Sequence, residues 1–178
     1  MGNCGSAVTA VLIAGALAGC AIDVPTDPQA FNIEPASLSQ LRASQQTVVL
    51  KNGYPGETKQ QFKVGPHTWI VDAKQLTDTA IAMLGRGLEK RGLTPAPQGA
   101  KTITLRVVAQ SASVQTFPGF AQTRVRLSLD ALTGDGTRVL VDADNMSPYS
   151  GQRAFDGAVL FALNKLLADE KFVTYLNR

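Results

Sequence analysis

Residues 102–108, TITLRVV, and residues 124–143, RVRLSLDALTGDGTRVLVDA, decide the fold because apolar and polar residues alternate along both stretches. Successive side chains of a β-strand point to opposite faces of the sheet, so this alternation predicts strands with one buried face and one solvated face. Thr133-Gly134-Asp135-Gly136 is typical of a hairpin turn, and the longer segment Thr116-Phe117-Pro118-Gly119-Phe120 is expected to be a loop. We therefore expect three consecutive antiparallel strands.

Two amphipathic helices flank these strands. The spacing of apolar residues predicts a helix over 73–91, with a capping box at Asp72 and Gln75 and a terminating Gly92. It predicts a second helix over about 152–167 and a short terminal helix after it. The apolar stripes are Leu76, Ala80, Ile81, Leu84 and Leu88 in the first helix and Phe155, Val159, Ala162, Leu163 and Leu166 in the second. This order predicts an α+β fold, a two-layer sandwich whose mainly antiparallel sheet carries two amphipathic helices on one face.

Other elements are expected around the first helix. Thr47–Leu50 is β-branched and apolar and predicts a strand. The segment 61–70 predicts a strand or irregular edge structure, interrupted by Gly65-Pro66. Gly85 and Gly87 lie inside the first helix, where glycine lowers helix stability. They indicate either the close approach of a neighbouring element or simple tolerance of glycine.

Composition limits the classes of protein to which the chain can belong. The 178 residues are 44% hydrophobic and 17% charged, which indicates a globular protein with one domain rather than a disordered chain. The net charge of +3 is modest and argues against nucleic acid as a partner. The two cysteines, Cys4 and Cys20, both precede the expected domain. A disulfide or a thiolate metal site is therefore not expected within it.

The N-terminus resembles the export signal of bacterial lipoproteins. Residues 7–18, AVTAVLIAGALA, form an apolar run of signal-peptide length, and Leu17-Ala18-Gly19-Cys20 resembles the lipobox that follows such a run. The resemblance implies that residues 1–19 are removed and that Cys20 is acylated, which makes the membrane a partner through a lipid anchor. In lipoproteins of this kind an Asp after the cysteine favours the inner membrane. Ala21 therefore implies the outer membrane, with the domain facing the periplasm.

Two other interpretations of the N-terminus remain open. Residues 1–6 contain no Lys or Arg, which departs from an ordinary signal peptide. Gly2 to Ser6 also fits the pattern for N-myristoylation, with Cys4 as a palmitoylation site, although that pattern leaves the apolar run unexplained. Alternatively, the run is a buried helix that happens to contain a cysteine.

The segment after Cys20 is expected to be a tether. Three prolines in residues 20–38 disfavour helix and predict an extended segment with a reach of up to about 50 Å. The alternative is that part of this segment packs on the domain through Phe31 and Ile33. The expected organisation is a signal peptide at 1–19, a lipidated N-terminus and tether at 20–38, and a single α+β periplasmic domain at 39–178.

Several segments of the folded part share a pattern with a known family. They are Leu88-Glu89-Lys90-Arg91-Gly92-Leu93, Thr102–Val108, Gly157–Leu166, Asp169 and Tyr175-Leu176. Together with the lipobox, they resemble the YajG-type family of bacterial outer-membrane lipoproteins over most of residues 47–178. The resemblance implies a fold and a location. It implies no reaction, because the family has no established activity.

The sequence does not indicate catalysis or a cofactor. The single histidine, His67, and the absence of Gly-x-Ser-x-Gly argue against a hydrolase triad, and too few His and Cys are present for zinc. Asp142-Ala143-Asp144-Asn145 begins like a calcium loop. However, Ser147 stands where that loop needs glycine, and Arg153 stands where it needs glutamate. Paired carboxylates of the glycoside-hydrolase kind stay open, because their approach is spatial.

Three arginines are candidate binding residues. Arg106, Arg124 and Arg126 fall in the outward phase of neighbouring strands and would form a cationic patch for phosphate-bearing lipid, lipopolysaccharide or an acidic protein. The alternative is an ordinary polar sheet face whose charge is neutralised by Asp130 and Asp142. Phe117 and Phe120 are the other candidates. Two aromatic side chains at a loop tip either mark a binding surface or fold back over the core.

We predict a non-enzymatic binding or scaffold module of the cell envelope, anchored to the outer membrane by lipid. Its expected partner is an envelope protein or an anionic lipid. The first alternative is an accessory subunit of an envelope complex that transports lipid or lipopolysaccharide. The second is an envelope hydrolase that uses two carboxylates, which would require a pocket with two close acids of raised pKa.

Overall fold

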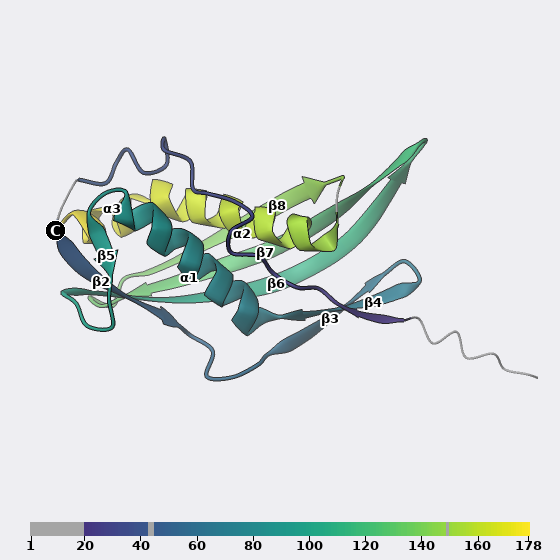
Figure 1. Ribbon diagram of the computed structural model, residues 1–178, viewed down its shortest axis with the longest axis horizontal. Helices are drawn as coiled ribbons and strands as arrows, with labels where there is room; N and C mark the ends of the chain where they lie inside the picture. Colours follow the sequence, from purple (N-terminus) through teal and green to yellow (C-terminus); the bar gives the residue numbers. More distant parts are fainter. Residues whose placement is uncertain (1–19, 43–44, 149) are drawn as a thin grey trace, which may run out of the picture.

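The computed structural model describes residues 20–42, 45–148 and 150–178, and the expected signal peptide at 1–19 lies outside them. A five-stranded sheet forms the centre of the fold, and Figure 1 shows it beneath the helices. Its strand order is β5-β2-β6-β7-β8. The bounds are Leu93–Pro95 for β5, Gln46–Asn52 for β2, Lys101–Phe117 for β6, Phe120–Thr133 for β7 and Arg138–Ser147 for β8.

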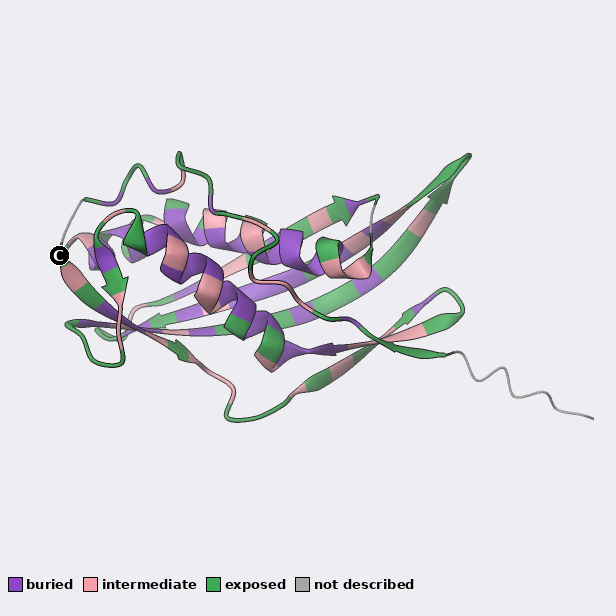
Figure 2. Ribbon diagram, in the orientation of Figure 1, coloured by how far each residue is buried: buried purple, intermediate pink, exposed green. Residues whose placement is uncertain are grey.

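Three helices complete the main layer. They are α1 at Ala73–Glu89, α2 at Gly151–Ala168 and α3 at Glu170–Asn177. Figure 1 shows α1 and α2 on the same face of the five-stranded sheet, and Figure 2 shows that much of both helices is buried. The predicted α+β fold with two amphipathic helices on one face is confirmed. The predicted apolar stripe of α2 is fully buried, from Phe155 to Leu166.

Local signals explain where α1 begins and ends. The carboxylate of Asp72 accepts a hydrogen bond from the backbone N–H of Lys74 at 2.9 Å, which caps the first turn. Gly92 has a φ of 78°, the left-handed conformation that ends helices and favours glycine. The predicted closing position of the helix is therefore confirmed.

Pairing within the sheet is antiparallel in one half and parallel in the other. The strands β6, β7 and β8 form the predicted antiparallel meander. The strand β2 pairs in parallel with both β5 and β6. A parallel pair needs a long connection, and the chain between β2 and β6 supplies it with a second sheet, α1 and β5.

The second sheet has three strands in the order β1-β4-β3. The strands β3 (Lys59–Val64) and β4 (His67–Asp72) form an antiparallel hairpin that turns at Gly65, whose φ is 58°. The strand β1 (Ala21–Asp23) adds to β4 in parallel. The segment 61–70, expected as a strand or irregular edge, is thus a regular hairpin at the edge of the molecule.

The expected loop at Thr116–Phe120 is wrong. The strand β6 continues to Phe117, and β7 begins at Phe120, with Phe117 and Phe120 opposite each other. Gly119, with a φ of 86°, and Pro118 alone make the turn. The two strands therefore form a long hairpin, which Figure 1 shows reaching beyond the helical layer.

The prediction of a free, extended tether over residues 20–38 also differs from the structure. Residues 20–42, here called the N-terminal segment, run along the helical layer (Figure 1). Four apolar side chains of the segment are buried in the core: Val24, Ile33, Leu38 and Leu41. Burial of this apolar area outweighs the freedom that an extended chain would keep. The alternative, packing through Phe31 and Ile33, is confirmed, since Ile33 is in the core and Phe31 packs against it.

Polar contacts hold the same segment along its length. The Arg86 guanidinium donates to the carbonyl oxygens of Pro28 and Phe31, and Arg91 Nε donates to Leu38 O at 2.7 Å. Gly87 explains the close approach. A Cβ on Gly87 would lie 2.9 Å from Cδ1 of Ile33, so only glycine lets the segment lie this near to α1. The segment is therefore part of the domain.

Candidate functional site

The three arginines do not form one cluster. Arg124 and Arg126 lie two residues apart on β7, whereas Arg106, on β6, lies opposite Asp130 of that strand. Asp130 is four residues from Arg126, which corresponds to about 13 Å along a strand. All three arginines lie on the sheet face away from α1 and α2, as predicted. The structure brings together Arg124 and Arg126 and separates Arg106 from them.

A single carboxylate neutralises the arginine pair. Arg124 Nε lies 2.9 Å from Oδ1 of Asp144, and Arg126 Nε lies 3.1 Å from Oδ2 of the same residue. The hydrogen bond from Arg124 is the main reason that the pKa of Asp144 falls below its usual value. Two cations share one anion here, so the pair keeps a local positive charge.

The neutralising residues expected from the sequence were wrong. Asp130 pairs with Arg138 at 2.7 Å, and Asp142 accepts a hydrogen bond from Ser128 Oγ at 2.5 Å. Neither contacts the predicted arginines through an ion pair among the described residues. Cross-strand register explains the difference, because Asp144 lies directly opposite Arg126 on β8.

Arg106 is held by the chain between β2 and β3. Its Nε donates to the carbonyl oxygen of Gly53 at 2.9 Å, and its guanidinium lies 5.7 Å from the centre of the Tyr54 ring. A Cβ on Gly53 would lie only 2.4 Å from Cγ of Arg106, so glycine makes this packing possible. Burial raises the pKa of Tyr54. Arg106 therefore has a clear structural role.

Phe117 and Phe120 remain at the surface. Their side chains are 40% and 53% exposed. The rings stack on each other with centroids 4.9 Å apart and planes 15° apart. Of the two alternatives for this pair, burial against the core is thus wrong. An exposed stacked aromatic pair stands at the tip of the β6–β7 hairpin.

Cys20 is the first residue that the structure describes, and it is exposed. Its carbonyl oxygen accepts a hydrogen bond from the N–H of Thr68 at 3.2 Å, and the next residue, Ala21, is already paired with Thr68 in β1 and β4. Thr68 is the second residue of β4, and only exposed His67 separates it from the turn at Gly65-Pro66. A lipid on Cys20 would therefore be joined directly to the three-stranded sheet.

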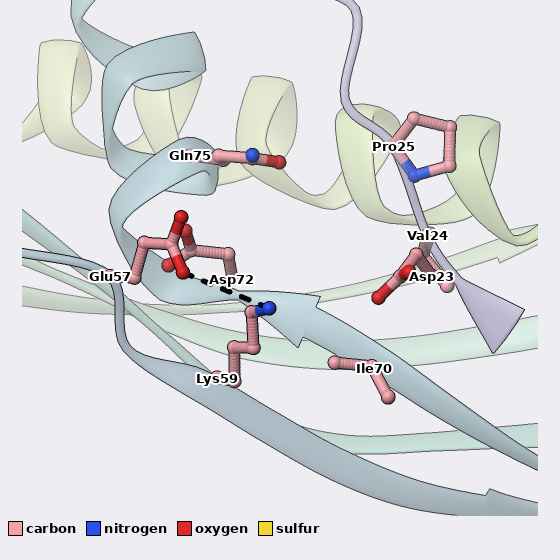
Figure 3. Close-up of a pocket in the computed structure, with 8 residues that line it drawn as sticks. All are labelled: Asp23, Val24, Pro25, Glu57, Lys59, Ile70, Asp72 and Gln75. Carbon is pink, nitrogen blue, oxygen red and sulfur yellow. Dashed lines mark ion pairs between the residues drawn. The ribbon is translucent and has the colours of Figure 1, made fainter. Parts of the chain in front are cut away.

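A polar cleft of about 460 Å³ lies where the N-terminal segment crosses between the hairpin and α1. Figure 3 shows Asp23 and Glu57 on opposite sides of Lys59, with Asp72 behind them. Lys59 and Glu57 form an exposed ion pair at 3.7 Å. Asp72 is occupied by the backbone N–H groups of Thr58 and Lys74. Its carboxylate therefore stabilises the start of α1.

A buried acid was missed by the sequence analysis. Asp156 lies in α2 with none of its surface exposed, and its Oδ2 accepts a hydrogen bond from the backbone N–H of Asp27 at 3.1 Å. The pKa of Asp156 is raised to about 7, mainly because burial disfavours the charged form; the hydrogen bond from the Asp27 backbone lowers it and the charge of Asp27 raises it, both to a smaller extent. Its other oxygen, Oδ1, has no hydrogen-bond partner among the described residues. The signal was present, since Asp156 stands three residues before Val159 on the apolar stripe.

Within residues 20–42, 45–148 and 150–178, no group of three or more His, Cys, Asp or Glu side chains is arranged to hold a metal ion. No helix in the same part of the chain is long and apolar enough to cross a membrane.

Comparison with known proteins gives a similarity to a solved structure. No protein-family model matches the chain, and no curated protein matches it. The crystal structure of protein XCC0632 from Xanthomonas campestris, a member of family DUF330, is similar with a TM-score of 0.45 and 12% sequence identity. The match covers 88% of this chain and 95% of that one.

Proposed function

We propose that the protein is a lipid-anchored scaffold or binding module of the bacterial cell envelope. The observation that carries the proposal is the position of Cys20. This residue ends the motif Leu17-Ala18-Gly19-Cys20, and it is exposed at the start of the folded domain. A thiol that is to receive a lipid must be accessible and must lie outside the core. Cys20 meets both conditions.

The direct connection between Cys20 and β1 supports a scaffold role. Because Ala21 already pairs with β4, a lipid on Cys20 would hold the domain close to the bilayer and in a restricted orientation. A domain on a long flexible linker would sample many orientations. A short, ordered attachment suits a protein that presents a fixed surface to a partner at the membrane.

The polar groups of the cleft support a role without catalysis. Asp72 is engaged by two backbone N–H groups, and Glu57 pairs with Lys59. Catalysis by two carboxylates needs one free acid and one free base at a suitable separation. These contacts instead serve the start of α1 and the surface of the hairpin. We therefore assign the cleft to structure.

The YajG-type resemblance belongs to the same proposal. It rests on the lipobox, the helix end at Leu88–Leu93 and the closing helical segment. On this basis we propose the outer membrane as the location, with the domain facing the periplasm. Ala21 supports this placement because it is not the Asp that favours the inner membrane in such lipoproteins.

The anchoring experiment replaces Cys20 and compares it with the other cysteine. Cys20→Ala should abolish acylation and leave a form that is uncleaved or soluble and absent from the outer-membrane fraction, since several acyl chains are needed for stable anchoring. Cys4→Ala is the matched control and should leave acylation intact, because Cys4 is removed with the signal. Mass spectrometry of the N-terminal peptide and membrane fractionation measure both effects. Acylation at Cys4 instead of Cys20 would refute the proposal.

A second substitution tests the membrane to which the protein is sorted. Ala21→Asp places the retention signal directly after the acylated cysteine, and Ala21 is exposed, so the fold should tolerate the change. The variant should move from the outer-membrane fraction to the inner-membrane fraction, while Ala21→Ser should not move. Identical fractionation of the two variants would remove the support that Ala21 provides.

A further inference from the structure

We infer that the tip of the β6–β7 hairpin is a second membrane contact, in which Phe117 and Phe120 enter the interface of the same bilayer that holds the lipid on Cys20. This inference rests on the proposed lipid anchor. It names the bilayer surface as the partner of the exposed aromatic pair.

Position is the first support. Figure 1 shows the β6–β7 tip and the β3–β4 turn at one end of the long axis of the molecule and the C-terminus at the other end. Cys20 lies beside the β3–β4 turn, because its carbonyl oxygen accepts the hydrogen bond from Thr68 near the start of β4. A bilayer that holds the lipid on Cys20 is therefore close to the end of the molecule from which the hairpin projects.

The projection of the hairpin is the second support. The strand β6 continues twelve residues past Leu105, its last residue paired with β2, which corresponds to about 40 Å of strand. On the other side, β8 stops opposite Thr123, three residues before the tip. The last part of the hairpin is thus a two-stranded ribbon. A two-stranded ribbon buries little of its own surface, so this surface is available for contact with another molecule.

Chemistry is the third support. Residues 107–123, which form the outer eleven residues of β6, the turn and the first four residues of β7, contain no Asp, Glu, Lys, Arg or His. Val114, Phe117 and Phe120 are exposed apolar side chains within this stretch. Charged side chains are costly in the membrane interior, whereas Phe is among the apolar side chains that interfacial segments bury at the boundary between headgroups and acyl chains. An uncharged ribbon with a stacked aromatic pair at its end matches this requirement.

Strand pairing limits how deeply the tip can enter. No described strand pairs with the outer edge of β6 beyond Ala109, where Gln60 bonds to the backbone through its side-chain amide. Unpaired backbone N–H and C=O groups are not tolerated in the hydrocarbon core. The tip therefore enters only the boundary between headgroups and acyl chains, to a depth of about 5–10 Å. The turn itself suits this depth because Pro118 has no N–H to satisfy.

The experiment uses a single tryptophan as a depth probe. The full chain is produced in cells with Trp69→Phe, which removes the only natural tryptophan, and with either Phe120→Trp or Leu140→Trp. The lipidated protein is placed in vesicles whose lipids carry bromine either near the headgroup end or near the methyl end of the acyl chains. Bromine quenches tryptophan fluorescence on contact. Circular dichroism tests whether each variant folds. If Trp69→Phe does not fold, Trp69 is kept in both variants, and the emission of the natural chain in the same vesicles is the baseline that is subtracted.

Leu140 is the matched control because it is as exposed as the tip but lies far from it. Its side chain is 64% exposed, and it pairs with Asp130, ten residues or about 33 Å along β7 from Phe120. Bromine near the headgroup end should quench Phe120→Trp to about half of its emission, with weaker quenching by bromine near the methyl end. Leu140→Trp should keep its full emission with both lipids.

The outcomes separate the two proposals. If the protein is acylated at Cys20 and Phe120→Trp is not quenched, the membrane contact is wrong and the lipid anchor stands. Equal quenching of Phe120→Trp and Leu140→Trp also overturns the contact, because the whole surface would then meet lipid. If Cys20 carries no lipid, the anchor is wrong, and the inference that rests on it fails as well. Crosslinking of position 120 to a protein without any quenching would identify a protein partner instead of the bilayer.

Discussion

The backbone N–H of Asp27 donates a hydrogen bond to the carboxylate of Asp156 at 3.1 Å, and this contact joins residues 129 positions apart in the chain. It ties the N-terminal segment to the buried side of α2. The next contact along the segment is between the hydroxyl groups of Thr26 and Thr79, at 2.9 Å, which ties it to α1. The segment is thus fastened to both helices of the layer at neighbouring residues.

We expect the stability of the protein to decrease between pH 4 and pH 7 because of Asp156. The pKa of this carboxyl is about 7 in the folded protein and about 3.9 in an unfolded chain. Below pH 4 the group is protonated in both states and has no effect. As the pH rises to 7, the unfolded state loses the proton first, which favours unfolding by roughly 2–4 kcal/mol. Urea denaturation measures the difference between pH 4.5, near the lower end of this range, and about pH 8, just above its upper end.

Asp156→Asn should remove most of this dependence. The amide oxygen can still accept the N–H of Asp27, and no charge is buried at pH 8, so the variant should be more stable than the natural protein there by about 1–3 kcal/mol. Asp78→Asn is the control, since Asp78 lies at the surface beside Lys74. If Asp156→Asn leaves the slope of stability against pH unchanged, the assignment of the buried carboxyl is wrong.

Two leucines test the packing of helices on the sheet. Leu84 of α1 and Leu163 of α2 are fully buried, so replacing each by Ala should lower the free energy of unfolding by about 2–5 kcal/mol. Leu132→Ala, on the exposed sheet face, should change it by less than about 1 kcal/mol. Chemical denaturation measures all three. Losses below about 1 kcal/mol at both buried sites would contradict the arrangement.

The arginines should differ in their contribution to stability. Arg106→Ala removes the hydrogen bond to Gly53 and the contact with the Tyr54 ring, and should cost about 1–2 kcal/mol. Arg126→Ala removes one exposed ion pair to Asp144 and should cost less than about 0.5 kcal/mol. Thermal denaturation at low and high salt compares them. Equal costs for the two variants would show that Arg106 is no better fixed than Arg126.

Ile33 tests whether the N-terminal segment is part of the domain. Ile33→Ser places a hydroxyl against Gly87 and removes a buried apolar side chain, so limited proteolysis should cut residues 20–42 at least about tenfold faster. Glu34→Ser, one residue away and exposed, should leave the rate of cleavage unchanged. Rapid cleavage of the natural protein within the segment would instead support the free tether.

The helices and the antiparallel strands could be predicted because their buried apolar residues recur at the spacing of a helix or a strand. Leu76, Leu84 and Leu88 recur at helical spacing and are all buried, and Val125, Leu127 and Leu129 alternate as the inner face of β7. The parallel partner of β2 could not be predicted in this way. Alternation states which face of a strand is buried and contains no information about which strand lies beside it.

The remaining differences also have physical causes. Residues 109–116 of β6, AQSASVQT, lack clear alternation because they extend beyond the helical layer and are mostly exposed. The sequence therefore did not predict that the strand continues to Phe117. The prolines of the N-terminal segment predict an extended chain, but they do not indicate whether the neighbouring Ile33 and Leu38 are buried. Asp144 was missed as the partner of Arg124 because the register between β7 and β8 depends on the turn at Gly136.

The parallel pairing of β1 with β4 has a mechanical consequence. A pulling force applied at Cys20 along the long axis acts along β1. It therefore strains all of the hydrogen bonds that join residues 20–24 to β4 at once, rather than one after another. Bonds loaded together in shear resist force better than bonds that are peeled apart in turn. Resistance to pulling depends on the rate of unfolding under load rather than on equilibrium stability. The short strand next to Cys20 therefore acts as a mechanical clamp.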